Sequence, residues 1–145
     1  MPADRVGRFL RLPAADRALL VRAVLTLLAA RLAIWVLPFR VVRRILTRRT
    51  ARKAAATGAS GERIGWAIDI AKRFVPNATC LPQAIAAESL LRRSGLPALM
   101  HIGVKKSVDG KLDAHAWVES EGHIIVGDLA EEFASYTPLP PLPAA

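Results

Sequence analysis

Apolar residues are nearly continuous between residues 15 and 37, where only a few polar side chains interrupt them. Pro38 follows and lacks the N–H that a helix interior needs, so the pattern predicts a long apolar helix over residues 15–37. Arg22 and Arg31 leave no uninterrupted run of about 18 apolar residues, the length that marks a membrane span. A helix packed on the domain or on a partner is therefore favoured over a transmembrane segment.

Helical spacing returns twice further along the chain. Ser60 is the predicted N-cap of a second helix, whose apolar positions recur every three or four residues: Ile64, Ala67, Ile68, Ala71, Phe74 and Val75. A third helix is predicted over about Cys80–Arg93, with Thr79 as N-cap and Gly95 as C-terminal stop. Pro82 is compatible with this helix because first-turn N–H groups have no helical partner.

Beyond Pro97 the pattern changes to short extended segments separated by turn dipeptides. Three strands are predicted, over residues 98–106, 112–120 and 123–127, with turns at Asp109-Gly110 and Glu121-Gly122. Helices followed by an antiparallel sheet predict an α+β fold. The Pro-rich tail is expected to be extended or disordered.

Positive charge is concentrated in the first part of the chain, which has 145 residues and a formal net charge of +9. Residues 1–53 hold 13 of the 21 Lys and Arg but only two acids, a net of +11, and the remainder therefore carries −2. The basic part suits a solvated helix face, an acidic partner or precursor, or an anionic membrane surface. A nucleic-acid function is not expected, because no binding motif or interleaved aromatic residues accompany the charge.

The presence of a single cysteine limits the kinds of site that this chain can form. It makes neither an internal disulfide nor a zinc framework, and no secretory signal pattern leads the chain, so a cytoplasmic location is expected. Cys80, His101 and His115 lack the tight spacing of metal ligands. Neither a metal nor a cofactor is expected.

Cys80, His115 and Asp128 are the candidate catalytic residues. A lone thiol at a helix start, with a histidine on a later strand and a carboxylate at the end of the next, is the pattern expected of a nucleophilic cysteine enzyme. The helix dipole and an adjacent imidazolium favour the thiolate. Unpaired first-turn N–H groups can also hold an oxyanion.

The register expected for the last hairpin predicts that His115 and Asp128 lie close together. A two-residue turn at Glu121-Gly122 pairs Ser120 with His123. The same register puts His115 directly opposite Asp128, on one face of the sheet. The carboxylate would then fix the imidazole tautomer and leave the other ring nitrogen for the thiol.

Two other acids on the His115 strand are rivals for the orienting role. Asp113 shares a face with His115 but lies along the same strand, about 6–7 Å away by strand rise. Glu119 is farther still. Gln83 is a further candidate for binding an oxyanion, although a glutamine on a helix surface usually has no such role.

Four stretches of the chain together resemble the leader peptidase of lasso-peptide biosynthesis, the protease half of the maturation protein. They are Arg11-Leu12-Pro13-Ala14-Ala15-Asp16-Arg17, Ala78-Thr79-Cys80-Leu81-Pro82-Gln83-Ala84, Gly95-Leu96-Pro97-Ala98 leading to Ile102-Gly103-Val104, and Ala114-His115-Ala116-Trp117-Val118-Glu119. The resemblance implies a transglutaminase-like (papain-like) cysteine protease core in which the Cys sits at a helix N-terminus packed on an antiparallel sheet. It implies an endopeptidase that cleaves a ribosomally made precursor, with Cys80 as nucleophile, His115 as base and then acid, and Asp128 as orienting carboxylate.

The resemblance also implies how the chain is divided into regions and which partners it acts with. We expect a basic, apolar helical region over residues 1–58, a peptidase core over 59–136 and a Pro-rich tail over 137–145. The expected partners are the precursor peptide, a separate leader-peptide-binding protein and an ATP-dependent lasso cyclase. Because too few residues precede residue 15 for a leader-binding domain, that partner is expected to act in trans.

Two other functions stay open at this point. The same triad can pass an acyl group to an amine, as a transglutaminase or acyltransferase does, because the acceptor decides the outcome. Alternatively, the chain is a non-catalytic basic adaptor that binds an acidic partner or a membrane surface, with Cys80 as an inert small hydrophobe.

Overall fold

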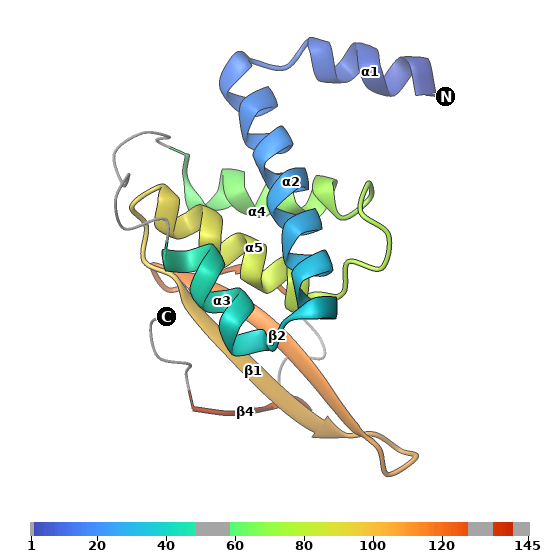
Figure 1. The fold of residues 1–145 in the computed structure, drawn as a ribbon, viewed down its shortest axis with the longest axis vertical. Coiled ribbons are helices and arrows are strands. Elements are labelled where there is room, and N and C mark those ends of the chain that lie inside the picture. The colour runs from blue at the N-terminus through green and yellow to red at the C-terminus, as the bar shows by residue number, and fades with distance from the viewer. Residues whose placement is uncertain (1, 49–58, 128–134, 141–145) are drawn as a thin grey trace.

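The structure is a computed structural model that describes residues 2–48, 59–127 and 135–140. Its helices and strands are, in chain order, α1 (Pro2–Leu10), α2 (Ala14–Val36), α3 (Phe39–Arg48), α4 (Gly61–Ala71), α5 (Cys80–Arg93), β1 (Leu99–Lys106), β2 (Leu112–Ser120), β3 (His123–Val126) and β4 (Thr137–Pro138). Figure 1 shows α1 projecting away from the rest of the molecule, beyond the first turns of α2. The three predicted helices and the three predicted strands are confirmed, although α4 ends at Ala71, before the predicted positions Phe74 and Val75. The elements α1, α3 and β4 were not predicted individually.

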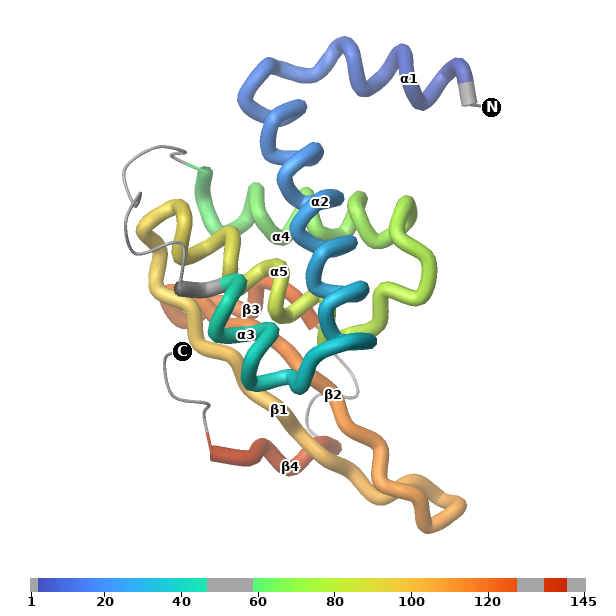
Figure 2. Tube along the Cα trace, in the orientation of Figure 1, coloured from blue at the N-terminus to red at the C-terminus, as the bar shows by residue number. Residues whose placement is uncertain are grey.

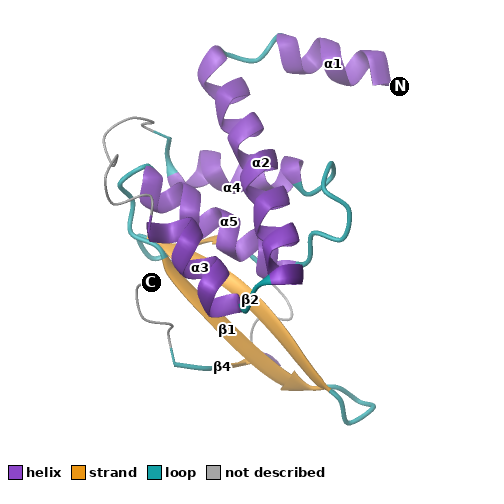
Figure 3. Ribbon diagram, in the orientation of Figure 1, coloured by secondary structure: helices purple, strands orange, loops and turns teal. Residues whose placement is uncertain are grey.

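Helices and sheet form two layers, which Figure 3 distinguishes by colour. The sheet is antiparallel with the strand order β3-β2-β1-β4. Helix α5 is central, since it packs on β1, β2 and β3 and also on α2, α3 and α4. The predicted α+β class, with N-terminal helices and an antiparallel sheet, is confirmed.

Local signals in the sequence explain where α4 and α5 begin and end. The Ser60 hydroxyl accepts a hydrogen bond from the Arg63 N–H at 3.3 Å and so caps α4. Helix α5 ends at Arg93, and Gly95 beyond it has a φ of 73°, a left-handed conformation that glycine adopts without steric cost. The N–H of Leu96 then donates to the carbonyl of Leu91 at 2.9 Å, which satisfies a carbonyl in the last turn.

The last hairpin turns where the sequence predicts but then departs from the predicted register. Glu121 and Gly122 both have positive φ, 51° and 81°, as a two-residue turn between strands requires. Ser120 pairs with His123 as predicted. A bulge then shifts the pairing so that Val118 lies opposite Val126.

The predicted juxtaposition of His115 and Asp128 rested on an unbroken ladder, and that register is wrong beyond the bulge. A bulge inserts one unpaired residue into one strand, and neither turn type nor alternation reveals it. Asp128 itself lies outside the described residues.

Helix α2 contributes one face to the core. Its buried residues are Leu19, Leu20, Ala23, Thr26, Leu27 and Ala30, and they face α4 and α5. By length and composition alone the helix could also cross a membrane. The buried face agrees with the prediction that residues 15–37 pack on the domain.

A buried ion pair attaches α3 to α5. The Arg43 guanidinium donates through Nε to Glu88 Oε2 at 2.9 Å and through Nη2 to Glu88 Oε1 at 2.8 Å. The side chains are only 7% and 0% exposed. Arg92 adds a third hydrogen bond to Glu88 at 3.1 Å. Arg43 therefore does not belong to a solvated helix face, which is one of the roles expected for the basic first part of the chain.

The short strand β4 lies at the edge of the sheet. It pairs with β1, Thr137 lying opposite Val104 and Pro138 opposite Gly103. Figure 2 shows β4 beside β1, on the other side of β1 from β2. The start of the predicted Pro-rich tail is thus extended. The predicted boundary at residue 58 lies outside the described residues, and the domain division stays a prediction.

Candidate active site

Cys80 is the first residue of α5 and is a partly exposed free thiol. The loop before it lines an open depression of about 460 Å³ formed by residues 72–79. In this loop Asn77 has a φ of 55°, the left-handed conformation that asparagine tolerates better than most residues. The chain therefore turns sharply just before Cys80, and the depression extends to Thr79, the residue that precedes it.

The first turn of α5 has free backbone donors close to the sulfur. Thr79 is the N-cap residue, but its side chain makes no capping hydrogen bond. Pro82 has no N–H, and the first N–H groups of any helix lack a helical partner. The amides of Cys80 and Leu81 are thus candidates to bind an oxyanion. Gln83 is a weaker candidate, because its side-chain amide already donates to the Ala78 carbonyl at 2.6 Å.

His115 lies on β2, and its environment defines the tautomer. The imidazole is buried, and its Nε2 lies 2.7 Å from the Gly127 carbonyl oxygen. A carbonyl oxygen can only accept, so Nε2 carries the proton and donates it. In the neutral ring Nδ1 is then the basic nitrogen, and it makes no hydrogen bond within the described residues. This is the state that a general base requires.

Two aromatic rings hold the imidazole in place. The ring centroids of His115 and Trp117 are 6.3 Å apart, and that of Tyr136 lies 5.5 Å from the imidazole at a tilt of 39°. Gly103 pairs with His115 on β1, where an added Cβ would lie 2.8 Å from the Trp117 ring and 3.0 Å from Tyr136 Cβ. Glycine is needed at this position because the Trp117 ring and the Tyr136 Cβ occupy the space that a side chain would need.

Tyr136 is itself fixed by polar contacts. Its hydroxyl donates to Asp113 Oδ2 at 3.0 Å, and the Lys105 ammonium lies 4.7 Å from the ring centroid. Burial raises the pKa of Tyr136 above its ordinary value, and the hydrogen bond and charge of Asp113 raise it further, against an opposing effect of Lys105. Tyr136 is therefore a protonated hydrogen-bond donor at neutral pH.

The rival acids on β2 have other partners. Asp113 accepts from Tyr136, and Glu119 lies 3.3 Å from Nε2 of His101. Neither contacts His115 in the described part of the chain. The backbone oxygen of Gly127 holds the imidazole instead, and it belongs to the residue directly before Asp128.

The structure places the elements that carry Cys80 and His115 against each other, but it does not join the two side chains. Helix α5 packs on β2, so the element that begins with Cys80 lies against the strand that carries His115. No hydrogen bond joins the two side chains among the interactions of the described residues. Over the same residues, no three His, Cys, Asp or Glu side chains group as metal ligands.

The sequence did not identify two residues that contact His115, namely Gly127 and Tyr136. Gly127 has a φ of 91°, and a Cβ there would lie 2.7 Å from both the Ala116 carbonyl oxygen and Trp117 Cβ. A glycine directly before the predicted acid was a usable signal for such a close approach. Tyr136 lies 21 positions after His115 in the chain, and no local pattern links the two residues.

Comparison with known proteins assigns the chain to a family. The sequence model described as the Transglutaminase-like superfamily matches residues 24–140. The chain belongs to the transglutaminase-like superfamily. It matches no curated protein and no protein of known structure.

Membership in the transglutaminase-like superfamily bears on the chemistry of Cys80. The superfamily generally comprises cysteine-dependent enzymes, and it is compatible with hydrolysis or with acyl transfer. The match begins inside α2 and ends after β4, so it includes Cys80, His115 and Tyr136.

Proposed function

We propose that this transglutaminase-like protein is a cysteine endopeptidase that removes the leader peptide from a ribosomally synthesised lasso-peptide precursor. The observation that carries the proposal is the state of His115, whose Nε2–H is bound to a backbone carbonyl and whose Nδ1 is left as a base. The partly exposed Cys80 thiol, beside free helix N–H groups, supplies the nucleophile.

In the proposed reaction, His115 Nδ1 takes the thiol proton and the Cys80 sulfur attacks the scissile carbonyl carbon. The oxyanion accepts hydrogen bonds from the amides at the start of α5. Collapse of this intermediate breaks the C–N bond, and the imidazolium gives its proton to the departing amine. Water then attacks the thioester, which releases the leader carboxylate and restores the thiol.

The proposed role of Asp128 is to stabilise the imidazolium. A carboxylate next to Gly127 would act together with the carbonyl that already binds Nε2–H. Asp128→Asn is then expected to lower the cleavage rate less than loss of Cys80 or His115, because the backbone acceptor is retained.

The proposed partners are a separate leader-peptide-binding protein, which presents the precursor, and an ATP-dependent cyclase, which uses the product. We propose that all three act in the cytoplasm. The activity therefore needs the precursor and the leader-binding protein together.

The decisive experiment incubates the protein with a precursor peptide and its leader-binding protein and identifies products by mass spectrometry. Cys80→Ala is expected to abolish cleavage while the circular dichroism spectrum stays that of the wild type. Two free fragments indicate hydrolysis, whereas an adduct to an amine indicates acyl transfer. Undiminished cleavage by Cys80→Ala would rule out the proposal.

A second experiment needs no substrate. The chain has one cysteine, so each alkylation by iodoacetamide reports on Cys80. At neutral pH His115→Gln is expected to slow the reaction, because the base that favours the thiolate is lost. His123→Gln, an exposed histidine on β3, is the matched control and is expected to react at the wild-type rate. Equal rates for all three proteins would contradict a Cys–His pair.

A further inference from the structure

Helix α2 has a second apolar face that the described residues leave uncovered. Val21, Leu25, Leu28, Leu32 and Trp35 follow one another in steps of four, three, four and three residues, which places them on one side of a helix. We call these five residues the outer stripe. Their exposed fractions are 48%, 60%, 36%, 51% and 80%, respectively. Apolar exposure of this extent along one helix is unusual for a monomer and marks an interaction surface.

The outer stripe lies opposite the face that α2 uses in the core. Ala23, Leu27 and Ala30 point inward and are fully buried. The helix therefore cannot give its whole circumference to a bilayer while the domain is folded. A ligand of the outer stripe must lie along one side of α2.

Positive charge is concentrated on α2 and on the segments directly before and after it. Over the described residues up to 48, the only acids are Asp4 and Asp16, and each is paired with an arginine, Arg8 and Arg63 respectively. The arginines that are exposed and form no ion pair in the described part of the chain are Arg5, Arg11, Arg22, Arg40 and Arg44. They give this part of the protein a positive field that no neighbouring acid offsets.

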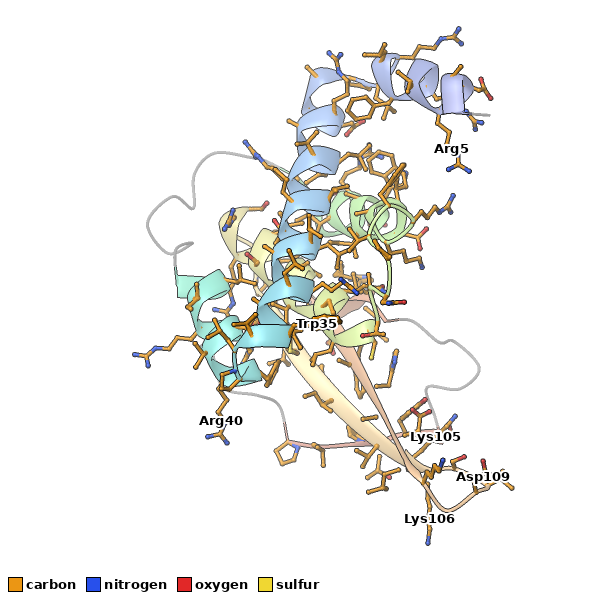
Figure 4. The ribbon with its side chains drawn as sticks, turned by 45° about the vertical axis from the view of Figure 1, so that its right-hand side comes forward. Arg5, Trp35, Arg40, Lys105, Lys106 and Asp109 are labelled. Atoms are coloured by element: carbon orange, nitrogen blue, oxygen red, sulfur yellow. The ribbon has the colours of Figure 1, made fainter. Side chains whose placement is uncertain are left out.

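The arginines extend well beyond the footprint of a single docked helix. Figure 4 shows Arg5 on α1, past one end of α2, and Arg40 on α3, past the other, with Trp35 near the α3 end. A second copy of this chain would bring arginine against arginine. A partner helix would cover the outer stripe but leave Arg5 and Arg40 without a counter-charge. An extended anionic surface can reach past both ends of α2 and so supply counter-charge at Arg5 and at Arg40.

We propose that the outer stripe docks on the surface of an anionic lipid bilayer, with α2 parallel to the membrane plane. Its apolar side chains enter the region between headgroups and acyl chains, and the arginines contact lipid phosphates. Trp35 suits this depth, because its ring is apolar and its N–H finds polar partners at the interface. The protein is thus peripheral to the membrane.

The test uses the full chain with two kinds of vesicle, phosphatidylcholine alone and phosphatidylcholine mixed with phosphatidylglycerol. Co-sedimentation is expected with the anionic vesicles only and is expected to weaken with added salt. Leu28→Glu with Leu32→Glu is expected to abolish binding. Arg22→Gln with Arg40→Gln is expected to weaken it by about tenfold or more.

Val108→Glu is the matched control for the outer stripe. Val108 is fully exposed in the β1–β2 turn, so it makes the same apolar-to-acid change away from α2. Its vesicle binding is expected to equal that of the wild type. Tryptophan emission, compared between the wild type and Trp35→Phe, is expected to shift to the blue on anionic vesicles through Trp35.

Three results would overturn the proposal. The first is the absence of wild-type binding to anionic vesicles, and the second is undiminished binding by the Leu28→Glu, Leu32→Glu protein. The third is a concentration-dependent dimer, seen by analytical ultracentrifugation, that the same double variant dissolves. Loss of leader-binding-protein association in that variant, without vesicle binding by the wild type, would assign the outer stripe to a protein partner instead.

Discussion

The helical half and the sheet half of this protein bury polar groups in different ways. Beneath α3 the helical half buries a full ion pair, in which Glu88 accepts from both Arg43 and Arg92. On the sheet, His115 is buried against a backbone carbonyl through one nitrogen only. A carboxylate with three donors has a structural role, whereas an imidazole held at one side keeps a nitrogen for chemistry. Substitutions should therefore change stability in the first region and reactivity in the second.

The largest effect on stability is expected from Glu88→Ala. The change removes the carboxylate that binds the buried Arg43 guanidinium through two hydrogen bonds, and breaking a buried ion pair from one side costs about 3–5 kcal/mol of unfolding free energy. Urea unfolding followed by circular dichroism measures this loss. A double variant, Arg43→Met with Glu88→Leu, removes both charges and is expected to recover most of it. A single variant as stable as the wild type would show that the ion pair is not the link between α3 and α5.

Gly127→Ala is expected to have the next largest effect, and it should change both the stability of the protein and the reactivity of Cys80. Its positive φ and the backbone contact at Ala116 together cost about 1–3 kcal/mol, and relief of this strain moves the carbonyl away from His115 Nε2. Slower alkylation of Cys80 should accompany the loss of stability.

Gly110→Ala is the control for this change. Gly110 has a similar φ of 79° but nothing within 4 Å of an added Cβ. It is expected to be destabilised by about 1 kcal/mol at most and to alkylate at the wild-type rate. If both alanine variants slowed Cys80 equally, the Gly127 carbonyl would have no special role.

These two regions also differ in how far the sequence predicts them. Helices α2, α4 and α5 follow from apolar spacing and from caps such as Ser60 and Gly95, because those signals are local. Cys80 and His115 are likewise marked by their positions at a helix start and in a strand. The Arg43–Glu88 pair joins residues 45 positions apart, and each looks like an ordinary charged side chain in the sequence.

The surroundings of His115 were predictable only up to the bulge. Alternation and the turn dipeptide fix the first pairs of the hairpin, but one extra residue changes what lies opposite His115. Tyr136 lies directly before β4, a strand of two residues that is too short to produce a pattern. The contacts of His115 with the Gly127 carbonyl and with Tyr136 are therefore determined by tertiary packing and not by local propensity.

Tyr136→Phe is expected to be milder than Gly127→Ala. The ring that packs on His115 is kept, and only the hydrogen bond to Asp113 is lost. Thermal unfolding should show a small decrease in stability, and Cys80 should alkylate at nearly the wild-type rate. Tyr136→Ala removes the ring as well and is expected to slow alkylation. Identical rates for the Phe and Ala variants would remove any role of the ring in holding the imidazole.

The titration of Tyr136 gives a pH-dependent prediction. It is the only tyrosine, so absorbance at alkaline pH follows it alone. Its pKa is raised by burial and by Asp113, so the midpoint in the folded protein should lie above the ordinary value of about 10 and return to it in denaturant. The folded state holds this proton more tightly, so its contribution is complete below pH of about 10 and is lost as pH rises through the raised value. Tyr136→Phe should remove that part of the alkaline loss, and an equal midpoint in folded and unfolded protein would contradict it.

The smallest effect is expected from Asp16→Asn, which tests the helical half at its surface. Asp16 binds Arg63 at 2.5 Å and so joins the starts of α2 and α4, but the Arg63 side chain is 42% exposed. Exposed ion pairs contribute about 0–1 kcal/mol and weaken in salt, unlike the pair of Arg43 and Glu88. Arg63→Ala should cost more than Asp16→Asn, because the guanidinium also lies 4.1 Å from the Trp66 ring centroid. Unfolding measured at low and high salt separates the two pairs. If the cost of Asp16→Asn approached that of Glu88→Ala and persisted in high salt, burial would not be what distinguishes them, and the contrast between the halves would need another cause.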